Sequence, residues 1–152
     1  MKKNNETVLL LLRIALGWLF LYSGLTKVMD PAWTSAGFLG SAKSFSGLFA
    51  WFGSPENIGW VDFLNQWGQL AIGVGLLTGT LTRLASYAGI LMMVLYYFPG
   101  LEFPRVERGY LIDSHIIYAL AFLVLAQLNA GQYWGGDQMI KKKFKKIKAW
   151  WF

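Results

Sequence analysis

Four long apolar runs constrain this chain more than any other feature of its sequence. They are Val8–Thr26, Phe63–Leu81, Leu84–Phe98 and Ser114–Leu128. Hydrophobic residues make up 55% of the 152 residues and charged residues only 14%, against about 25% charged in a typical soluble domain. Because unpaired backbone groups are costly in hydrocarbon, apolar runs of this kind cross a bilayer as helices. We therefore predict an all-α fold, an integral membrane four-helix bundle.

Lysines and arginines orient these spans, because cytoplasmic loops of membrane proteins carry an excess of them. Nine of the 14 basic residues fall on one side, namely Lys2, Lys3, Arg83 and six lysines of the C-terminal tail. On the other side, the loops 27–62 and 99–113 hold acidic residues that balance or outnumber the basic ones. We predict a multi-pass inner-membrane protein with cytoplasmic N- and C-termini and two outer loops.

The first apolar run begins like a secretory signal, since two lysines precede it. Its length, the charge of Arg13 within it and the bulky residues Trp18, Phe20 and Tyr22 near the expected cleavage region argue against cleavage. We expect the segment to be retained as the first span.

The first outer loop contains an amphipathic pattern. Phe38, Ala42, Phe45, Phe49 and Phe52 recur at helical spacing. Such a stripe predicts one helix that lies in the outer interface or folds over the mouth of the bundle. If the helix folds over the mouth of the bundle, it would act as a lid.

The chain divides into a membrane domain, residues 1–138, and a basic amphipathic tail, residues 139–152. Six of the 14 tail residues are lysines, while apolar residues share one face of a predicted C-terminal helix: Ile140, Phe144, Ile147 and Trp151. A helix of this kind binds the anionic cytoplasmic leaflet. We therefore expect membrane lipids as partners and no nucleic acid.

Three stretches of the sequence carry a family resemblance. They read LLRIALGWLFLYSGLTKVMDPAW, WGQLAIGVGLLTGTLTRLASYAGILMMVLYYF and IDSHIIYALAFLVLAQLNAGQYWGGD. Their most telling pieces are the first helix with Gly24 and Lys27, the Gly79–Arg83 turn, Asp113–His115 and Gly131–Asp137. In this order and spacing the chain resembles the DoxX family over about residues 8–137, in particular the DoxD-like branch named for the small subunit of thiosulfate:quinone oxidoreductase.

The resemblance implies a four-helix membrane protein linked to quinone or sulfur redox metabolism. It also implies quinone as the ligand, and a second subunit or a homo-oligomer as the assembly. A shared fold does not determine which reaction a protein catalyses, so the function depends on the individual residues of the site.

The candidate catalytic residues are His115, Asp113 and Lys27, all near the outer boundary. His115 is the one histidine, and its ordinary pKa lies near neutrality. A quinone headgroup requires a hydrogen-bond donor at its carbonyl oxygen and a proton route to water, which His115 backed by Asp113 would supply. We expect Lys27 to pair with Asp30 or Asp113. The alternative for His115 is an interfacial or helix-capping role.

Other polar residues near the same boundary are candidates for substrate binding. We name Gln69 from the second span, Tyr97 from the third, and Glu102 and Arg105 from the second outer loop. Together with Glu107 and Arg108, the loop residues would attract or position an anion such as a sulfur oxyanion.

Two intramembrane charges lie near the inner boundary, Arg13 and Arg83. Arg13 either snorkels to the boundary or faces the bundle interior and binds carbonyls or polar groups there. No metal is predicted, because one histidine, scattered carboxylates and no cysteine do not form a compact ligand set.

Three functions fit these features. The leading hypothesis is a quinone-linked redox subunit, in which a sulfur anion such as thiosulfate is oxidised at the outer face. The second is a non-enzymatic assembly partner or chaperone of membrane proteins. The third is a binder or carrier of a small molecule or lipid within the outer polar cluster.

Overall fold

The computed structural model of this chain describes residues 3–106 and 109–143, and within them the chain is mostly helical, as predicted. The helices are α1 (Lys3–Met29), α2 (Ala36–Gly40), α3 (Ser46–Phe52), α4 (Ile58–Thr78), α5 (Thr82–Gly100), α6 (Ser114–Gln127), the 3₁₀ helix η1 (Ala130–Gln132) and α7 (Gly136–Lys143). Lys2, Glu107, Arg108 and the tail from Phe144, with Ile147 and Trp151, lie outside the described residues.

The second outer loop forms a small sheet that the sequence patterns do not predict. Its antiparallel strands, in the order β1-β2-β3, are β1 (Leu101–Glu102), β2 (Arg105–Val106) and β3 (Gly109–Tyr110). In β2, Val106 is buried, which anchors the sheet.

Each predicted span corresponds to one long helix. Helices α1 and α5 extend beyond the predicted spans at both ends, and α6 ends one residue earlier. Helix α4 begins and ends before the predicted Phe63–Leu81. It ends at Thr78 because Gly79 takes a left-handed φ of 67° and its amide binds the carbonyls of Gly75 and Leu76.

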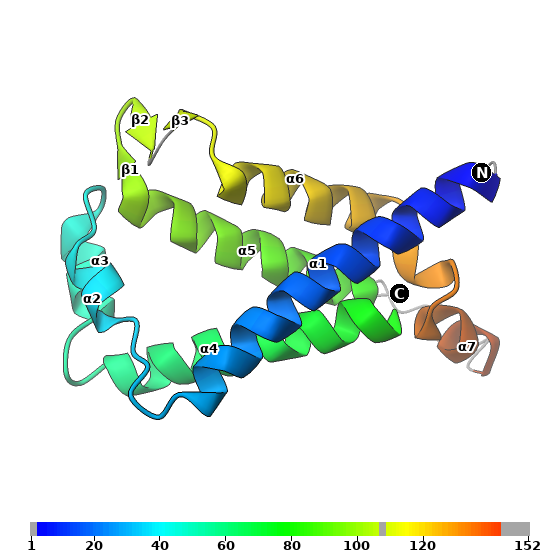
Figure 1. Cartoon of the computed structure of the whole chain (residues 1–152), viewed down its shortest axis with the longest axis horizontal. Coiled ribbons are helices and arrows are strands. Elements are labelled where there is room, and N and C mark those ends of the chain that lie inside the picture. Colours follow the sequence, from blue (N-terminus) through cyan, green and yellow to red (C-terminus); the bar gives the residue numbers. More distant parts are fainter. Residues whose placement is uncertain (1–2, 107–108, 144–152) are drawn as a thin grey trace.

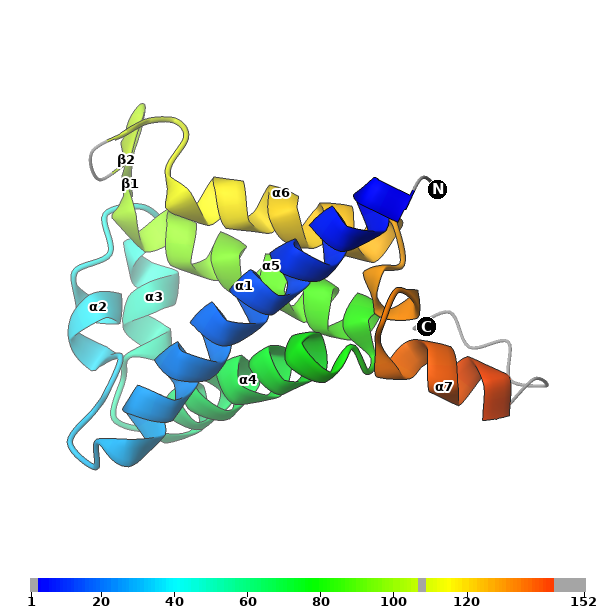
Figure 2. The same ribbon diagram turned by 45° about the vertical axis from the view of Figure 1, so that its right-hand side comes forward.

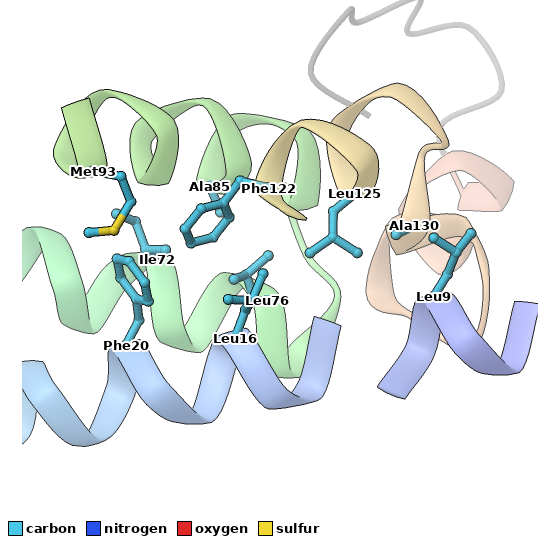
Figure 3. Packing of buried hydrophobic residues seen from close by; sticks show 10 residues of the cluster. All are labelled: Leu9, Leu16, Phe20, Ile72, Leu76, Ala85, Met93, Phe122, Leu125 and Ala130. Atoms are coloured by element: carbon cyan, nitrogen blue, oxygen red, sulfur yellow. The ribbon is translucent and has the colours of Figure 1, made fainter. Parts of the chain in front are cut away.

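The four long helices pack around one apolar core. Helix α1 packs on α4, α4 on α5, α5 on α6, and α6 touches α1, so that each has two neighbours among them (Figures 1 and 2). All four contribute to the core, and Phe20 of α1 meets Phe122 of α6 edge to face, with ring centroids 4.9 Å apart. Figure 3 shows the cluster: Leu9, Leu16, Phe20, Ile72, Leu76, Ala85, Met93, Phe122, Leu125 and Ala130.

Glycines bring α1 and α4 into backbone contact, which is the packing role expected for them. A Cβ atom at Gly73 would lie 2.6 Å from the Cα of Leu21, and one at Gly24 would lie 2.8 Å from the amide nitrogen of Leu70. No side chain fits at either position unless the two helices move apart.

The two ends of the bundle differ. Helices α2 and α3 and the small sheet lie at one end, whereas the start of α1 and helix α7 lie at the other (Figure 1). Helix α7 is the described part of the predicted C-terminal amphipathic helix. By length and hydropathy, α1 is the one described helix able to cross a membrane, over Asn5–Met29. Crossing by all four long helices remains a prediction.

The predicted outer helix is wrong in one respect, since α2 and α3 are two short helices. The chain breaks between them because Phe45 adopts a left-handed φ of 53° and the neighbouring residues bind the end of α5. The amide of Lys43 donates to the carbonyl of Pro99 (2.9 Å), and the Ser44 hydroxyl donates to the carbonyl of Leu101 (2.6 Å). These bonds fix the segment over one end of the bundle.

The close α1–α4 contact predicts a specific sensitivity. We expect Gly73→Ala to lower the free energy of unfolding in detergent by about 1–3 kcal/mol, because the added methyl group overlaps the α1 backbone. The matched control is Gly59→Ala in the same helix, where a Cβ meets nothing within 4 Å. That change should leave stability unchanged or raise it by up to about 1 kcal/mol. Equal effects of the two substitutions would refute the close contact.

Candidate functional site

The ammonium group of Lys27, near the end of α1, organises a polar cluster between three helices. Its Nζ donates to Gln69 Oε1 (2.8 Å), Asn65 Oδ1 (3.1 Å) and the Tyr96 hydroxyl (3.2 Å). Helix α4 supplies the two amides, and α5 supplies the tyrosine. A lysine ammonium has three donors, so these neutral acceptors match its whole hydrogen-bonding capacity.

The acceptors of Lys27 are themselves linked. The Tyr96 hydroxyl donates to Asn65 Oδ1 (2.8 Å), and Gln69 Nε2 donates to the Tyr96 oxygen (3.2 Å). The Ser23 hydroxyl of α1 donates to Gln69 Oε1 (3.1 Å). Because Gln69 is only 3% exposed, this network holds each member in one orientation.

Among the residues that the structure describes, no carboxylate pairs with the Lys27 ammonium group. Within the described residues, Lys27 forms no ion pair, so the expected pairing with Asp30 or Asp113 is wrong. Asp30 accepts the amide of Ala32 (3.0 Å) instead, and Asp113 is engaged at the start of α6. The positive charge therefore remains available to an electron-rich group placed beside it.

Asp113 and His115 form a pair at the N-terminus of α6. Asp113 is the N-cap residue, and its Oδ1 accepts the amides of His115 (3.0 Å) and Ile116 (3.3 Å). Its other oxygen lies 2.5 Å from His115 Nδ1. The imidazole also meets the Tyr96 ring edge to face, at 6.0 Å between centroids. His115 thus contacts Asp113 as expected, whereas the capping role belongs to Asp113 and not to His115.

These groups surround a cavity of about 260 Å³, here called the outer pocket. Trp33 lies with its ring 5.0 Å from Lys27 Nζ. The connection after α1 covers the pocket, since the Ser35 amide and hydroxyl both donate to Asp62 Oδ1 (2.9 and 2.5 Å). The lining residues are Lys27, Trp33, Thr34, Ser35, Phe38, Asn65, Tyr96 and His115.

The four predicted substrate-binding residues do not line the outer pocket, although Gln69 binds Lys27 beside it. The Tyr97 hydroxyl donates to the carbonyl of Leu111 (2.7 Å). Glu102 forms an exposed ion pair with Lys43 (2.6 Å), and the hydrogen bond from Lys43 lowers the pKa of Glu102. Arg105 is exposed on β2, opposite Glu102 and Tyr110. A role in attracting an anion to this end of the molecule stays a prediction for these residues.

The sequence alone does not predict which residues of the connection after α1 line the outer pocket. From the sequence, Trp33 is expected in the belt of aromatic residues at the membrane surface, and Phe38 on the apolar face of the predicted outer helix. Ser35 and Thr34 have no periodic signal, and their position depends on the long-range bond to Asp62.

A second buried polar cluster lies at the opposite end of the bundle, around Arg13. Its side chain is 1% exposed, and its Nη1 and Nη2 donate to the carbonyls of Ala130 (3.0 Å) and Trp134 (3.1 Å). Of the two expected orientations, the inward-facing one is correct and snorkelling is wrong. Gly79 and Gly135 have no room for a Cβ atom beside this guanidinium.

Asp137 completes this inner cluster, although its importance is not evident from the sequence. It is 2% exposed, and its carboxylate accepts the amides of Leu81 (2.6 Å) and Thr82 (3.1 Å). Those amides begin α5, where a negative charge is favourable. Arg83 follows in the first turn of α5 and is partly buried.

No three histidine, cysteine, aspartate or glutamate side chains gather as a metal site in residues 3–106 and 109–143. The absence of a metal from the function remains a prediction.

Comparison with known proteins gives one match. A family model described as DoxX matches residues 8–99, more than half of the chain. No curated protein matches the chain, and no solved structure does. Lys27, Gln69 and Tyr96 fall within the matched part, whereas Asp113 and His115 follow it.

The inner cluster predicts a large stability effect. We expect Arg13→Met to lower the free energy of unfolding by about 3–5 kcal/mol, because it removes the donors of two carbonyls and the positive charge that interacts with buried Asp137. Arg105→Met removes the same charge from an exposed strand and should change stability by at most about 0.5 kcal/mol. Chemical denaturation in detergent measures both. A small effect at Arg13 would show that its hydrogen bonds are not needed.

Proposed function

The chain belongs to the DoxX family of membrane proteins, and on that premise we propose that it is a quinone-linked redox subunit of the cell membrane. The observation that carries the proposal is the outer pocket, where the Lys27 cation and the His115–Asp113 pair line or border one cavity. Among DoxX proteins we place it with the DoxD-like branch, whose namesake oxidises thiosulfate and reduces quinone.

The proposed topology has α1, α4, α5 and α6 crossing the bilayer, with both termini in the cytoplasm. Apolar side chains exposed on the outer faces of these helices support it, because lipid would cover them: they include Val8, Leu11, Trp18, Phe63, Val94 and Leu120. The excess of basic residues at the termini and at Arg83 supports the orientation. The outer pocket then lies near the outer face of the membrane.

The outer pocket suits a quinone headgroup. Quinone carbonyl oxygens accept hydrogen bonds, and two-electron reduction adds two protons to them. One of the three Lys27 Nζ donors would exchange its present side-chain acceptor for one such oxygen, and the ammonium charge would stabilise the negative charge that develops there. Tyr96 and Asn65 hold Lys27 in place.

His115 would move the protons. Because the Asp113 carboxylate engages Nδ1, Nε2 is the ring atom left to exchange a proton with the ligand, and Asp113 would stabilise the charged imidazolium. The pair lies at the end of the bundle that carries the loops (Figure 1), from which protons would arrive. Lys27, His115 and Asp113 thus keep the roles proposed from the sequence.

The electrons would come from an anion at the outer face. Two thiosulfate ions joined through a sulfur–sulfur bond release two electrons, which matches the two electrons and two protons of quinone reduction. Exposed Arg105 and the Lys43–Glu102 pair lie at the same end, on a surface where a second subunit or another copy of this chain would bind.

A second candidate, a lipid binder without redox activity, is favoured by one observation. The outer pocket continues into a much larger apolar groove that shares Ser35, Phe38, Asn65 and Tyr96 with it. A carrier of any amphiphile would need a polar pocket next to an apolar groove. The test must therefore separate quinone binding from quinone reduction.

The test is thiosulfate-dependent quinone reduction in proteoliposomes that contain the purified chain with any subunit that co-purifies. We expect His115→Ala to lower the rate by about 100-fold or more, the usual contribution of a positioned acid–base group. Lys27→Met should weaken quinone binding and slow reduction.

The matched control is Lys141→Met, which removes an exposed lysine of α7 at the opposite end of the bundle and should leave the rate unchanged. Activity unaltered by His115→Ala would remove the histidine from the mechanism. Quinone binding without any reduction would favour the lipid binder.

A further inference from the structure

A long apolar groove runs between α4 and α5. Its volume is about 750 Å³, and it extends from the outer pocket to Thr80 and Leu81 at the turn that joins the two helices. From Tyr96 to Leu81 along α5, the helical rise gives a length of about 22 Å. One cavity thus leads from a polar end to an apolar interior.

The groove follows from the way the helices diverge. Helices α4 and α5 meet at the Gly79–Leu81 turn and separate toward the end covered by α2 and α3 (Figures 1 and 2). Small residues face the space between them, including Gly68, Ala71 and Ala88. At the wide end, Phe49 and Phe52 of α3 close it.

The dimensions favour a single extended chain as the occupant. A volume of about 750 Å³ over about 22 Å gives a mean cross-section of about 34 Å². A space this long and narrow matches the shape of one extended hydrocarbon chain.

The polarity of the two ends fixes how such a chain would lie. The lining between the ends is apolar, for example Leu64 and Leu91. At its wide end the groove adjoins Lys27, which forms no ion pair with the residues that the structure describes. An occupant with one apolar tail and one electron-rich headgroup matches this arrangement.

We propose that the α4–α5 groove binds the isoprenoid tail of the quinone whose headgroup occupies the outer pocket, an inference that rests on the proposed function. Lining residues at several positions of the groove are exposed, namely Leu64, Leu84 and Leu91, so the ligand would reach the pocket sideways from the lipid. Bonds from Lys43 and Ser44 to the end of α5 hold α2 and α3 across the wide end, which keeps this route separate from water.

The experiment uses a long-tailed quinone that carries a photoreactive diazirine on its tail. The full chain in nanodiscs is irradiated, and the labelled peptides are identified by mass spectrometry. We expect labels on the facing walls of α4 and α5, near Ala71, Ala88 and Leu91. Exposed positions on the outer face of α1, such as Leu11 and Trp18, should remain unlabelled.

Groove-filling variants supply the decisive comparison. Ala88→Phe and Ala71→Phe place a ring in the groove from opposite walls, at exposed positions that the fold does not need to bury. Each should reduce labelling about tenfold or more, because crowding weakens binding. Ala15→Phe, at an exposed position of α1 outside the groove, is the matched control and should leave labelling unchanged.

Two further probes separate this proposal from the proposed function. A tail-less quinone should be reduced equally by the wild type and Ala88→Phe. If it is reduced but the long-tailed probe labels all lipid-facing surfaces alike, the groove proposal is overturned and the proposed function stands. If the wild type reduces no quinone, the proposed function fails and this inference fails with it. A hydrocarbon probe without the quinone ring that labels the groove equally well would also overturn the proposal.

Discussion

The fold depends on the need to satisfy two cations carried by one apolar helix. Helix α1 places Arg13 and Lys27 about 21 Å apart, at 1.5 Å per residue. Arg13 binds the carbonyls of Ala130 and Trp134, which ties the segment after α6 to α1. Lys27 binds side chains of α4 and α5. Each charge therefore brings distant parts of the chain together at its own end of the bundle.

The need to satisfy these two cations explains why the two ends of the bundle differ in their polar groups and in their packing. At the Arg13 end, the acceptors are backbone carbonyls, and Asp137 binds the amides that begin α5. The cluster is closely packed, as the lack of room beside Gly79 and Gly131 shows, and it suits a structural role. At the Lys27 end, the acceptors are side chains beside a cavity, and no carboxylate of the described part of the chain pairs with the charge. Such an end suits a ligand.

The sequence predicts the helices well and the orientation of single side chains less well. Apolar runs determine where α1, α4, α5 and α6 lie, because hydropathy and length are properties of local sequence. Neighbouring residues such as Tyr96 and Tyr97 point about 100° apart on a helix, and only Tyr96 reaches the outer pocket. The position of Ser35 depends on Asp62 far along the chain, and no local pattern encodes such a contact.

The central claim is that the ends marked by Lys27 and Arg13 face opposite sides of a membrane. The chain has no cysteine, so single cysteines can be introduced at the exposed positions Phe103 and Met139 and treated with a membrane-impermeant maleimide on intact cells. The account predicts that Phe103→Cys is labelled from outside and that Met139→Cys is labelled only after the membrane is opened. Labelling of both cysteines from the same side would contradict it.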